Sequence, residues 1–471
     1  MTALRPASAL LARAFGWGSA MALVRLACSF LSIKVTAVVL GPAGLVLVAQ
    51  FTGLVSLLQS MLGQGLVTGS VRQAAACAAD TAARRRIHAT ALRMGAALAG
   101  VAALALALGA GPLAAWLLAD RALAPLIALA ALAVAAAMWT DVLHGALGVS
   151  KEVGLIARST IAATLLGLAL FTGATHLWGL TGALAASVSV FLGAAAVATA
   201  VVHWRARGVA LRDFVGPFDR AACRQILGVY PMLIVHGAVT PLALILVRDT
   251  LATGLGLEAA GFWQAAWRLS EAYLALIVSS VTLVFMPSLG ERSGQPQAQR
   301  RQILRMLVAA TAAVAATAAV VCLLREDIVR VVLSGRFEPV AALMPVQLAG
   351  DVLKIAGWIL CMALVATLRT RWFVAITLLG AVCFVAGTRA LVPQFGLHAA
   401  PWAYLASSAL QTLLAAWALR DLLWRPPPDS AAQALPVAPA GPGLGAAAAA
   451  GAEAPTMAPS ALPFAPAGVT R

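Results

Sequence analysis

The sequence predicts an all-α integral membrane protein of about twelve transmembrane helices. Of its 471 residues, 62% are hydrophobic and only 11% are charged, whereas a soluble domain is about one quarter charged. The mean hydropathy is +0.93. Apolar stretches of about 18 residues or more, which is the length needed to cross a bilayer, recur along almost the whole chain. So few charges could not cover the surface of a water-soluble protein.

The expected helices are separated by short connections whose residues favour turns. Gly41-Pro42 follows the first helix, Gly111-Pro112 lies late in the third, and Pro393 precedes the twelfth. Hydrophobic periodicity predicts helices at 14–40, 43–68, 92–118, 123–146, 153–175, 178–203, 226–252, 259–288, 304–324, 341–368, 371–392 and 398–424.

The basic residues predict the orientation of these helices. The formal charge is +16, from 33 Lys and Arg against 17 Asp and Glu. Of the bases in the connections, most follow even-numbered helices, among them Arg84, Arg85, Arg86, Lys151, Arg205, Arg207, Arg212, Arg220, Arg224, Arg292, Arg300, Arg301, Arg369 and Arg371. Because cytoplasmic loops are enriched in Lys and Arg, both termini are expected in the cytoplasm. The same rule explains the net positive charge, so the charge does not indicate a nucleic-acid-binding protein.

A basic connection divides the predicted helices into two groups of six. Residues 1–203 form the N-terminal group, 204–225 the cytoplasmic linker and 226–424 the C-terminal group, and the Ala- and Pro-rich tail 425–471 is expected to be disordered. Ala43-Gly44 followed by Gln50 is echoed by Ala260-Gly261 followed by Gln264, which suggests an internal duplication. The six cysteines and six histidines are scattered, so we expect no disulfide framework, metal site or cofactor.

Ionisable side chains inside predicted helices indicate function, because burying them in a membrane is costly. Gln264, Arg268 and Glu271 are spaced i, i+4 and i+7, so they share one face of a helix. Asp351 and Lys354 are three residues apart and could pair. The bases expected to bind substrate are Arg25, Lys34, Arg248, Arg268 and Lys354, and the carboxylates expected to couple transport to protons are Glu271 and Asp351.

Two interpretations of these charges are open. In the first, they form buried ion pairs that fix helix packing. This interpretation is favoured for Asp141 and His144, and for Asp351 and Lys354 it is as well supported as a role in transport. In the second, five central bases face only Asp249, Glu271 and Asp351, and an uncompensated buried positive charge is expensive. A water-filled cavity for an anionic substrate would explain that excess.

Several segments resemble the Wzx-type polysaccharide flippases, which include lipid III and O-antigen translocases and belong to a superfamily with MATE exporters and lipid II flippases. The segments are Leu23-Val24-Arg25, Lys34, Gly41-Pro42-Ala43-Gly44, Gly261-Phe262-Trp263-Gln264, Ser270-Glu271-Ala272-Tyr273, Leu323-Leu324-Arg325 and Gln347-Leu348-Ala349-Gly350-Asp351-Val352-Leu353-Lys354. The resemblance covers roughly residues 10–424. In this family basic residues match Arg25, Lys34 and Lys354 and an acidic one matches Glu271, whereas Arg268 departs from the pattern.

The resemblance implies a MATE-like, V-shaped bundle of two six-helix lobes in the bacterial inner membrane. It implies translocation of an undecaprenyl-pyrophosphate-linked oligosaccharide to the periplasmic leaflet by alternating access, with a polysaccharide polymerase and a chain-length regulator as possible partners. The alternatives are a MATE-type cation exporter, whose cavity should be acidic, and a lipid II flippase, which normally has fourteen helices. A membrane-embedded polymerase or ligase would need a large periplasmic loop, and no connection predicted on the periplasmic side exceeds roughly 17 residues.

Overall fold

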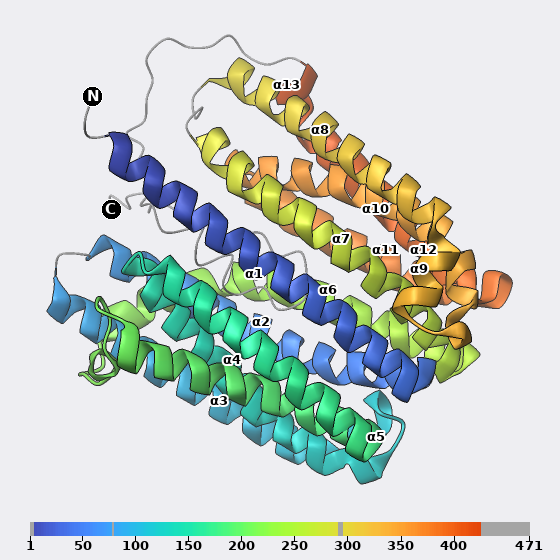
Figure 1. The fold of residues 1–471 in the computed structure, drawn as a ribbon. Helices are drawn as coiled ribbons and strands as arrows, with labels where there is room; N and C mark the ends of the chain where they lie inside the picture. Colours follow the sequence, from blue (N-terminus) through green and yellow to red (C-terminus); the bar gives the residue numbers. More distant parts are fainter. Residues whose placement is uncertain (1–3, 78–79, 291–294, 425–471) are drawn as a thin grey trace.

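The computed structural model describes residues 4–77, 80–290 and 295–424 and contains no strand within them (Figure 1). The predicted tail 425–471 and Arg292 lie outside the described residues. The α-helices are α1 (Leu4–Val39), α2 (Gly41–Ala76), α3 (Thr81–Leu117), α4 (Ala124–Val149), α5 (Val153–Arg205), α6 (Arg220–Leu255), α7 (Leu257–Gly290), α8 (Pro296–Leu323), α9 (Arg325–Val332), α10 (Pro339–Ala366), α11 (Thr370–Phe395), α12 (Ala399–Ala418) and α13 (Arg420–Trp424). Short 3₁₀ turns occur at Arg121–Leu123, Leu211–Phe214, Gly335–Phe337 and Gly396–His398.

The described helices are long and apolar enough for a membrane protein. Nine helical segments within the described ranges could cross a bilayer by length and composition. Two of these, 153–205 and 370–418, have 53 and 49 residues, about twice the length that one crossing needs. Each is interrupted by a glycine, at Gly179 and Gly396, and each expected apolar range overlaps an observed helix. The number of crossings and the side on which the termini lie stay predictions.

The turns between helices repeat in the two halves of the chain. Backbone φ is positive at Gly41 and Gly256, after α1 and α6, and again at Gly179 and Gly396, inside α5 and after α11. Glycine adopts this conformation without the steric penalty that a Cβ brings. Lys151 and Leu368, which precede α5 and α11, form a third pair with positive φ. These matching turns support the duplication that the Ala-Gly echo suggested.

Several expected boundaries were wrong, and the capping residues explain why. The break expected at Pro393 does not occur there: Pro393 lies inside α11, which ends at Phe395 before Gly396. The helices also extend beyond the apolar runs. Asp80 caps α3 by accepting from the backbone N of Ala82 and Ala83, and Asp219 caps α6 in the same way. Such caps satisfy the free N–H groups of a first turn, so polar ends outside the hydrocarbon stay helical.

The helices form two groups with α1 and α6 between them (Figure 1). Helices α2 to α5 gather on one side, and α7, α8 and α10 to α12 on the other. Helix α2 of the first group packs most extensively against α6, and it also packs against α7 of the second group. We call the contact of α2 with α6 and α7 the interlobe seam. At its start, the backbone of Gly261 is so close to Pro42 that a Cβ on Gly261 would lie 2.1 Å from the Pro42 carbonyl oxygen.

Large apolar side chains cover much of the outer surface of the bundle. Leu108 on α3, Val308 on α8 and Val382 on α11 are 78%, 67% and 63% exposed. A monomeric soluble protein rarely exposes contiguous apolar surface of this kind, whereas lipid tails accommodate it at no cost. The bundle is therefore a multi-pass membrane protein.

The connections lie at opposite ends of the bundle in alternation. At one end, the Arg85 Nε donates to Asp213 at 2.8 Å, and Glu152 accepts from the backbone N of Arg207, so the start of α3 meets the connection around 213, and the connections around 151 and 207 meet. Burial raises the pKa of Asp213, but hydrogen bonds from the Ala210 backbone and from Arg85 outweigh it and hold that pKa below its usual value. At the other end, Lys34 donates to the carbonyl of Val331.

Labelling of single cysteines tests which end faces the cytoplasm. With cysteine at Arg84 or Arg212, a membrane-impermeant maleimide should react only after the cytoplasmic face is opened, because both sites lie at the basic end. Cysteine at Leu255, at the opposite end and exposed, should react in intact cells. Labelling of position 212 from outside would contradict the predicted orientation, and position 84 serves as the internal control.

Candidate functional site

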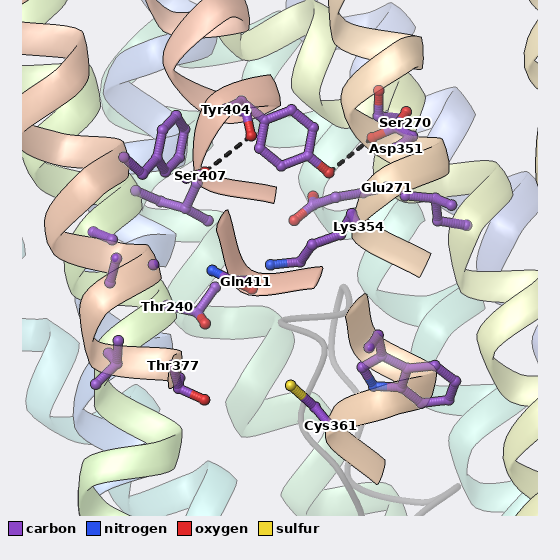
Figure 2. Close-up of a pocket in the computed structure, with 18 of the residues that line it drawn as sticks. Thr240, Ser270, Glu271, Asp351, Lys354, Cys361, Thr377, Tyr404, Ser407 and Gln411 are labelled. Atoms are coloured by element: carbon purple, nitrogen blue, oxygen red, sulfur yellow. Dashed lines mark hydrogen bonds between the residues drawn. The ribbon is translucent and has the colours of Figure 1, made fainter. Parts of the chain in front are cut away.

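A cavity of about 100 Å³ lies within the C-terminal group of helices. Its walls come from α6, α7, α10, α11 and α12 (Figure 2). Glu271, Asp351 and Lys354 line it together with apolar side chains such as Trp358 and Phe373. Three of the seven residues expected from the sequence to serve substrate or protons therefore meet at one cavity.

Asp351 is held in place by two tyrosines from other helices. Its side chain is 0% exposed, and its Oδ2 and Oδ1 accept from the hydroxyls of Tyr273 at 2.6 Å and of Tyr404 at 2.9 Å. Hydrogen bonds to a carboxylate offset part of its desolvation cost. The ring of Trp267 packs edge-on against Tyr404, with centroids 5.1 Å apart, and keeps that ring in position. Asp351 thus joins α7, α10 and α12.

Lys354 does not form the ion pair that its spacing from Asp351 suggested. Asp351 is an electrostatic neighbour of the Lys354 ammonium, but within the described part of the chain the two are not within the 4.0 Å of a salt bridge. The Lys354 Nζ also makes no hydrogen bond to a described residue. Figure 2 shows it pointing into the cavity toward Gln411. The hydrogen bonds of Asp351 come from the two tyrosines instead.

Glu271 and Arg268 form a pair at the edge of the cavity. The Arg268 Nη1 lies 3.6 Å from the Glu271 Oε2, and their side chains are 23% and 15% exposed. Glu271 lines the cavity and Figure 2 shows its carboxylate between Tyr404 and Lys354, whereas Arg268 is not part of the lining. The predicted stripe of Gln264, Arg268 and Glu271 therefore extends along α7 from the interlobe seam to the cavity.

Arg248 lies in the interlobe seam and does not line the cavity. Its side chain is 4% exposed. The Nε donates to Gln264 Oε1 at 2.6 Å, and the Nη1 donates to the Ala49 carbonyl at 3.2 Å and to Gln50 Oε1 at 3.5 Å. Gln50 in turn donates to the Ile245 carbonyl. Arg268 and Glu271 are charged groups that act on it electrostatically.

The two predicted bases on α1 have other surroundings. Arg25 is half-buried and acts electrostatically on Asp141 of α4, which accepts a hydrogen bond from Gln59 at 2.9 Å. Lys34 is exposed and donates to the Val331 carbonyl of α9 at 2.8 Å. Neither lines the cavity. Asp141 was left out of the count of five central bases against three acids, so Arg25 has an acidic neighbour that the count missed.

Sequence reasoning missed the polar residues that complete the cavity. Tyr273, Tyr404, Gln411 and Thr240 all contribute to its lining or its hydrogen bonds. The chain has only three tyrosines, and two of them bind Asp351, so their rarity in apolar helices was a usable signal. Among the described residues no group of three His, Cys, Asp or Glu side chains could hold a metal ion.

Comparison with known proteins places the chain among membrane transporters. No family model matches it. It is 27% identical over 416 residues to the lipid III flippases of Escherichia coli (strain K12) and Shigella flexneri, covering 88% of this chain and 99% of theirs. An inward-facing MATE family transporter of the MOP superfamily has a TM-score of 0.68 at 15% identity, covering 85% of this chain and 98% of that one.

The lipid II flippase MurJ in an inward closed conformation has a TM-score of 0.70 at 9% identity, covering 86% of this chain and 87% of its own. These two solved structures show the fold. The resemblance noted in the sequence is thereby confirmed: the chain has the fold of the MATE-type transporters and is similar in sequence, along nearly their whole length, to the lipid III flippases.

Proposed function

We propose that the chain is an inner-membrane flippase for an undecaprenyl-pyrophosphate-linked oligosaccharide, such as lipid III or an O-antigen unit. It moves this lipid from the cytoplasmic to the periplasmic leaflet by alternating access, for the synthesis of surface polysaccharide. The observation that carries the proposal is the similarity to lipid III flippases over 99% of their length. A polysaccharide polymerase and a chain-length regulator would act on the product.

The charged side chains inside the bundle suit this substrate. A pyrophosphate cannot cross hydrocarbon unshielded, because transfer of an isolated charge costs many kcal/mol. Arg268 and Lys354 lie in the middle of their helices, and the Lys354 ammonium is available to an anion. The cavity of about 100 Å³ is smaller than the roughly 300–1,000 Å³ of ordinary ligand pockets. It therefore fits one phosphate or carboxylate group and not the whole headgroup.

The other predicted residues extend this site. We propose that Arg25 and Lys34 on α1 meet the headgroup as it enters and leaves, because both lie on a helix between the two groups (Figure 1). Glu271 and Asp351 are the proposed proton-coupling groups. The Arg268–Glu271 pair supports this role for Glu271, because Arg268 would be released whenever the carboxylate is neutralised.

One observation favours a second candidate, a MATE-type exporter of organic cations. The charged residues lining the cavity are two carboxylates, Glu271 and Asp351, against the one ammonium of Lys354. A cation would be attracted by that balance. The fold fits both candidates equally, since MATE transporters and MurJ are both structural neighbours.

Complementation separates the two candidates. Expression in a strain lacking its lipid III flippase should restore surface polysaccharide and lower the accumulated lipid-linked precursor, while leaving the efflux of a cationic dye unchanged. Arg25→Ala and Lys34→Ala should reduce restoration at normal membrane abundance, and Arg25→Lys and Lys34→Arg should keep part of it, because point charge matters for phosphate binding. Dye efflux without restoration would favour the exporter.

A further inference from the structure

We propose that Arg248, together with Gln50 and Gln264, is a latch that closes one end of the transport path. This inference rests on the proposed alternating-access transport, and it assigns Arg248 a positioning role in place of substrate binding. The three side chains come from α6, α2 and α7, so the latch joins both groups of helices. The two glutamines are the same pair that the Ala-Gly echo related to each other in the sequence.

The contacts of Arg248 cross the interlobe seam in both directions. Its Nη1 donates to the Ala49 carbonyl and to Gln50 Oε1 on α2, and Gln50 donates back to the Ile245 carbonyl on α6. Gln264 on α7 accepts from the Nε at 2.6 Å and so fixes the direction of the guanidinium. These bonds can form only while α2 lies against α6 and α7.

The latch lies close to the end of the bundle opposite the basic connections. Arg248 is seven residues before the end of α6 at Leu255, and Gln264 is seven residues after the start of α7 at Leu257. The helices approach one another closely there. A Cβ on Gly53 would lie 3.0 Å from the Arg248 Nη1, and Gly261 contacts the backbone of Pro42. Opening this end requires these surfaces to separate.

The latch holds an unneutralised charge. Within the described part of the chain no carboxylate forms a salt bridge with Arg248, and its acceptors are two amide side chains and a carbonyl. Its neighbour Glu271 is paired with Arg268. Burying a guanidinium without a counter-ion is costly, and that cost is relieved when water enters. The charge therefore favours opening, while its hydrogen bonds favour closure.

Because the charge favours opening and its hydrogen bonds favour closure, variants that remove one or the other should shift the balance between the closed and open states in opposite directions. Gln50→Leu removes acceptors from a charge that stays buried, which penalises the closed state. Arg248→Met removes the charge itself and leaves an apolar side chain that prefers to stay buried, which penalises the open state. A packing role alone would make both variants loosen the seam. The sign of the Arg248→Met effect thus distinguishes a latch from ordinary packing.

The reporter is a cysteine at Ala260, which is 0% exposed beside the Gly261–Pro42 contact. It is introduced into a chain whose six native cysteines are replaced by alanine. The labelling rate by a membrane-impermeant maleimide is measured from both faces, in cells that do not make the lipid-linked oligosaccharide. The readout therefore does not depend on the proposed substrate. Cysteine at Thr253, exposed on the same end of α6, is the matched control and should react equally in all variants.

We expect Gln50→Leu to raise the labelling rate of Cys at 260 severalfold, since it removes the Gln50 Oε1 that accepts from Arg248 at 3.5 Å, a distance at which a hydrogen bond to a charged group is weakened. Gln264→Leu should raise it as well, Arg248→Met should leave it unchanged or lower it, and Arg248→Met combined with Gln50→Leu should return it to the starting rate. An increase with Arg248→Met, or none with Gln50→Leu, would overturn the latch. If complementation fails while the labelling results are as expected, the proposed substrate is wrong and the latch is still supported.

Discussion

Replacing Lys354 by alanine is expected to reduce export of surface polysaccharide by about tenfold or more at normal membrane abundance. The Lys354 ammonium points into the cavity and makes no hydrogen bond to a described residue, so its charge is available to substrate. A hydrogen bond to a charged group typically contributes 1.5–3 kcal/mol, about ten- to a hundredfold in binding. Lys354→Arg should keep part of the activity, because the charge remains while the shape changes.

The matched control for Lys354 is Arg371→Ala, which removes one positive charge from the exposed start of α11. It should leave export unchanged. The measurements are surface polysaccharide and the amount of protein in the membrane. If Lys354→Ala exports normally, the cavity does not bind the substrate. If the variant protein is lost from the membrane, Lys354 acts in helix packing and not in binding.

Gly261→Ala is expected to abolish export and to lower the thermal midpoint of the purified protein by several degrees. The added Cβ would lie 2.1 Å from the Pro42 carbonyl oxygen, a backbone atom that cannot turn away. Helices α2 and α7 must then separate. Overpacking of this kind typically costs roughly 1–3 kcal/mol. Because the affected contact is part of the interlobe seam, closure of that end should suffer most.

Gly228→Ala is the matched control, since Gly228 lies in α6 with no atom within 4 Å of its would-be Cβ. Alanine is a better helix former than glycine by about 1 kcal/mol. This variant should therefore be neutral or slightly stabilising and should export normally. If Gly261→Ala has the same thermal midpoint as Gly228→Ala, the interlobe seam accommodates the added Cβ without loss of stability, and the prediction is wrong.

The long helices were predictable from the sequence because each contains a long apolar run, whereas their ends and the short polar helix α9 were not. Asp80 and Asp219 extend helices into polar segments through side-chain caps, which hydrophobic periodicity does not detect. Pro393 looked like a break but can be accommodated near the end of α11, whereas the turn needs the positive φ that Gly396 supplies. Local chemistry, and not hydropathy, decided these boundaries.

The candidate site was predictable in its charges but not in its partners. Glu271, Asp351 and Lys354 could be identified because ionisable groups are rare in apolar helices. The hydrogen bonds of Asp351 join residues 78 and 53 positions apart, and no local pattern encodes such contacts. Likewise, the sequence position of Arg248 predicted that it lies near one end of its transmembrane helix. Its hydrogen bond to the Ala49 carbonyl could not be predicted, because it depends on how α2 and α6 pack.

The paired turns of the two halves also bear on the symmetry of transport. If each half crosses the membrane six times, both enter from the same face, and the operation that relates them is a rotation about the membrane normal. Gly41 and Gly256 then occupy equivalent places around that axis, as do Gly179 and Gly396. A lipid headgroup that moves along such an axis would contact two halves that share a backbone fold but differ in their side chains. The protein would then recognise sugar and phosphate through the positions at which the two halves differ, such as Lys354.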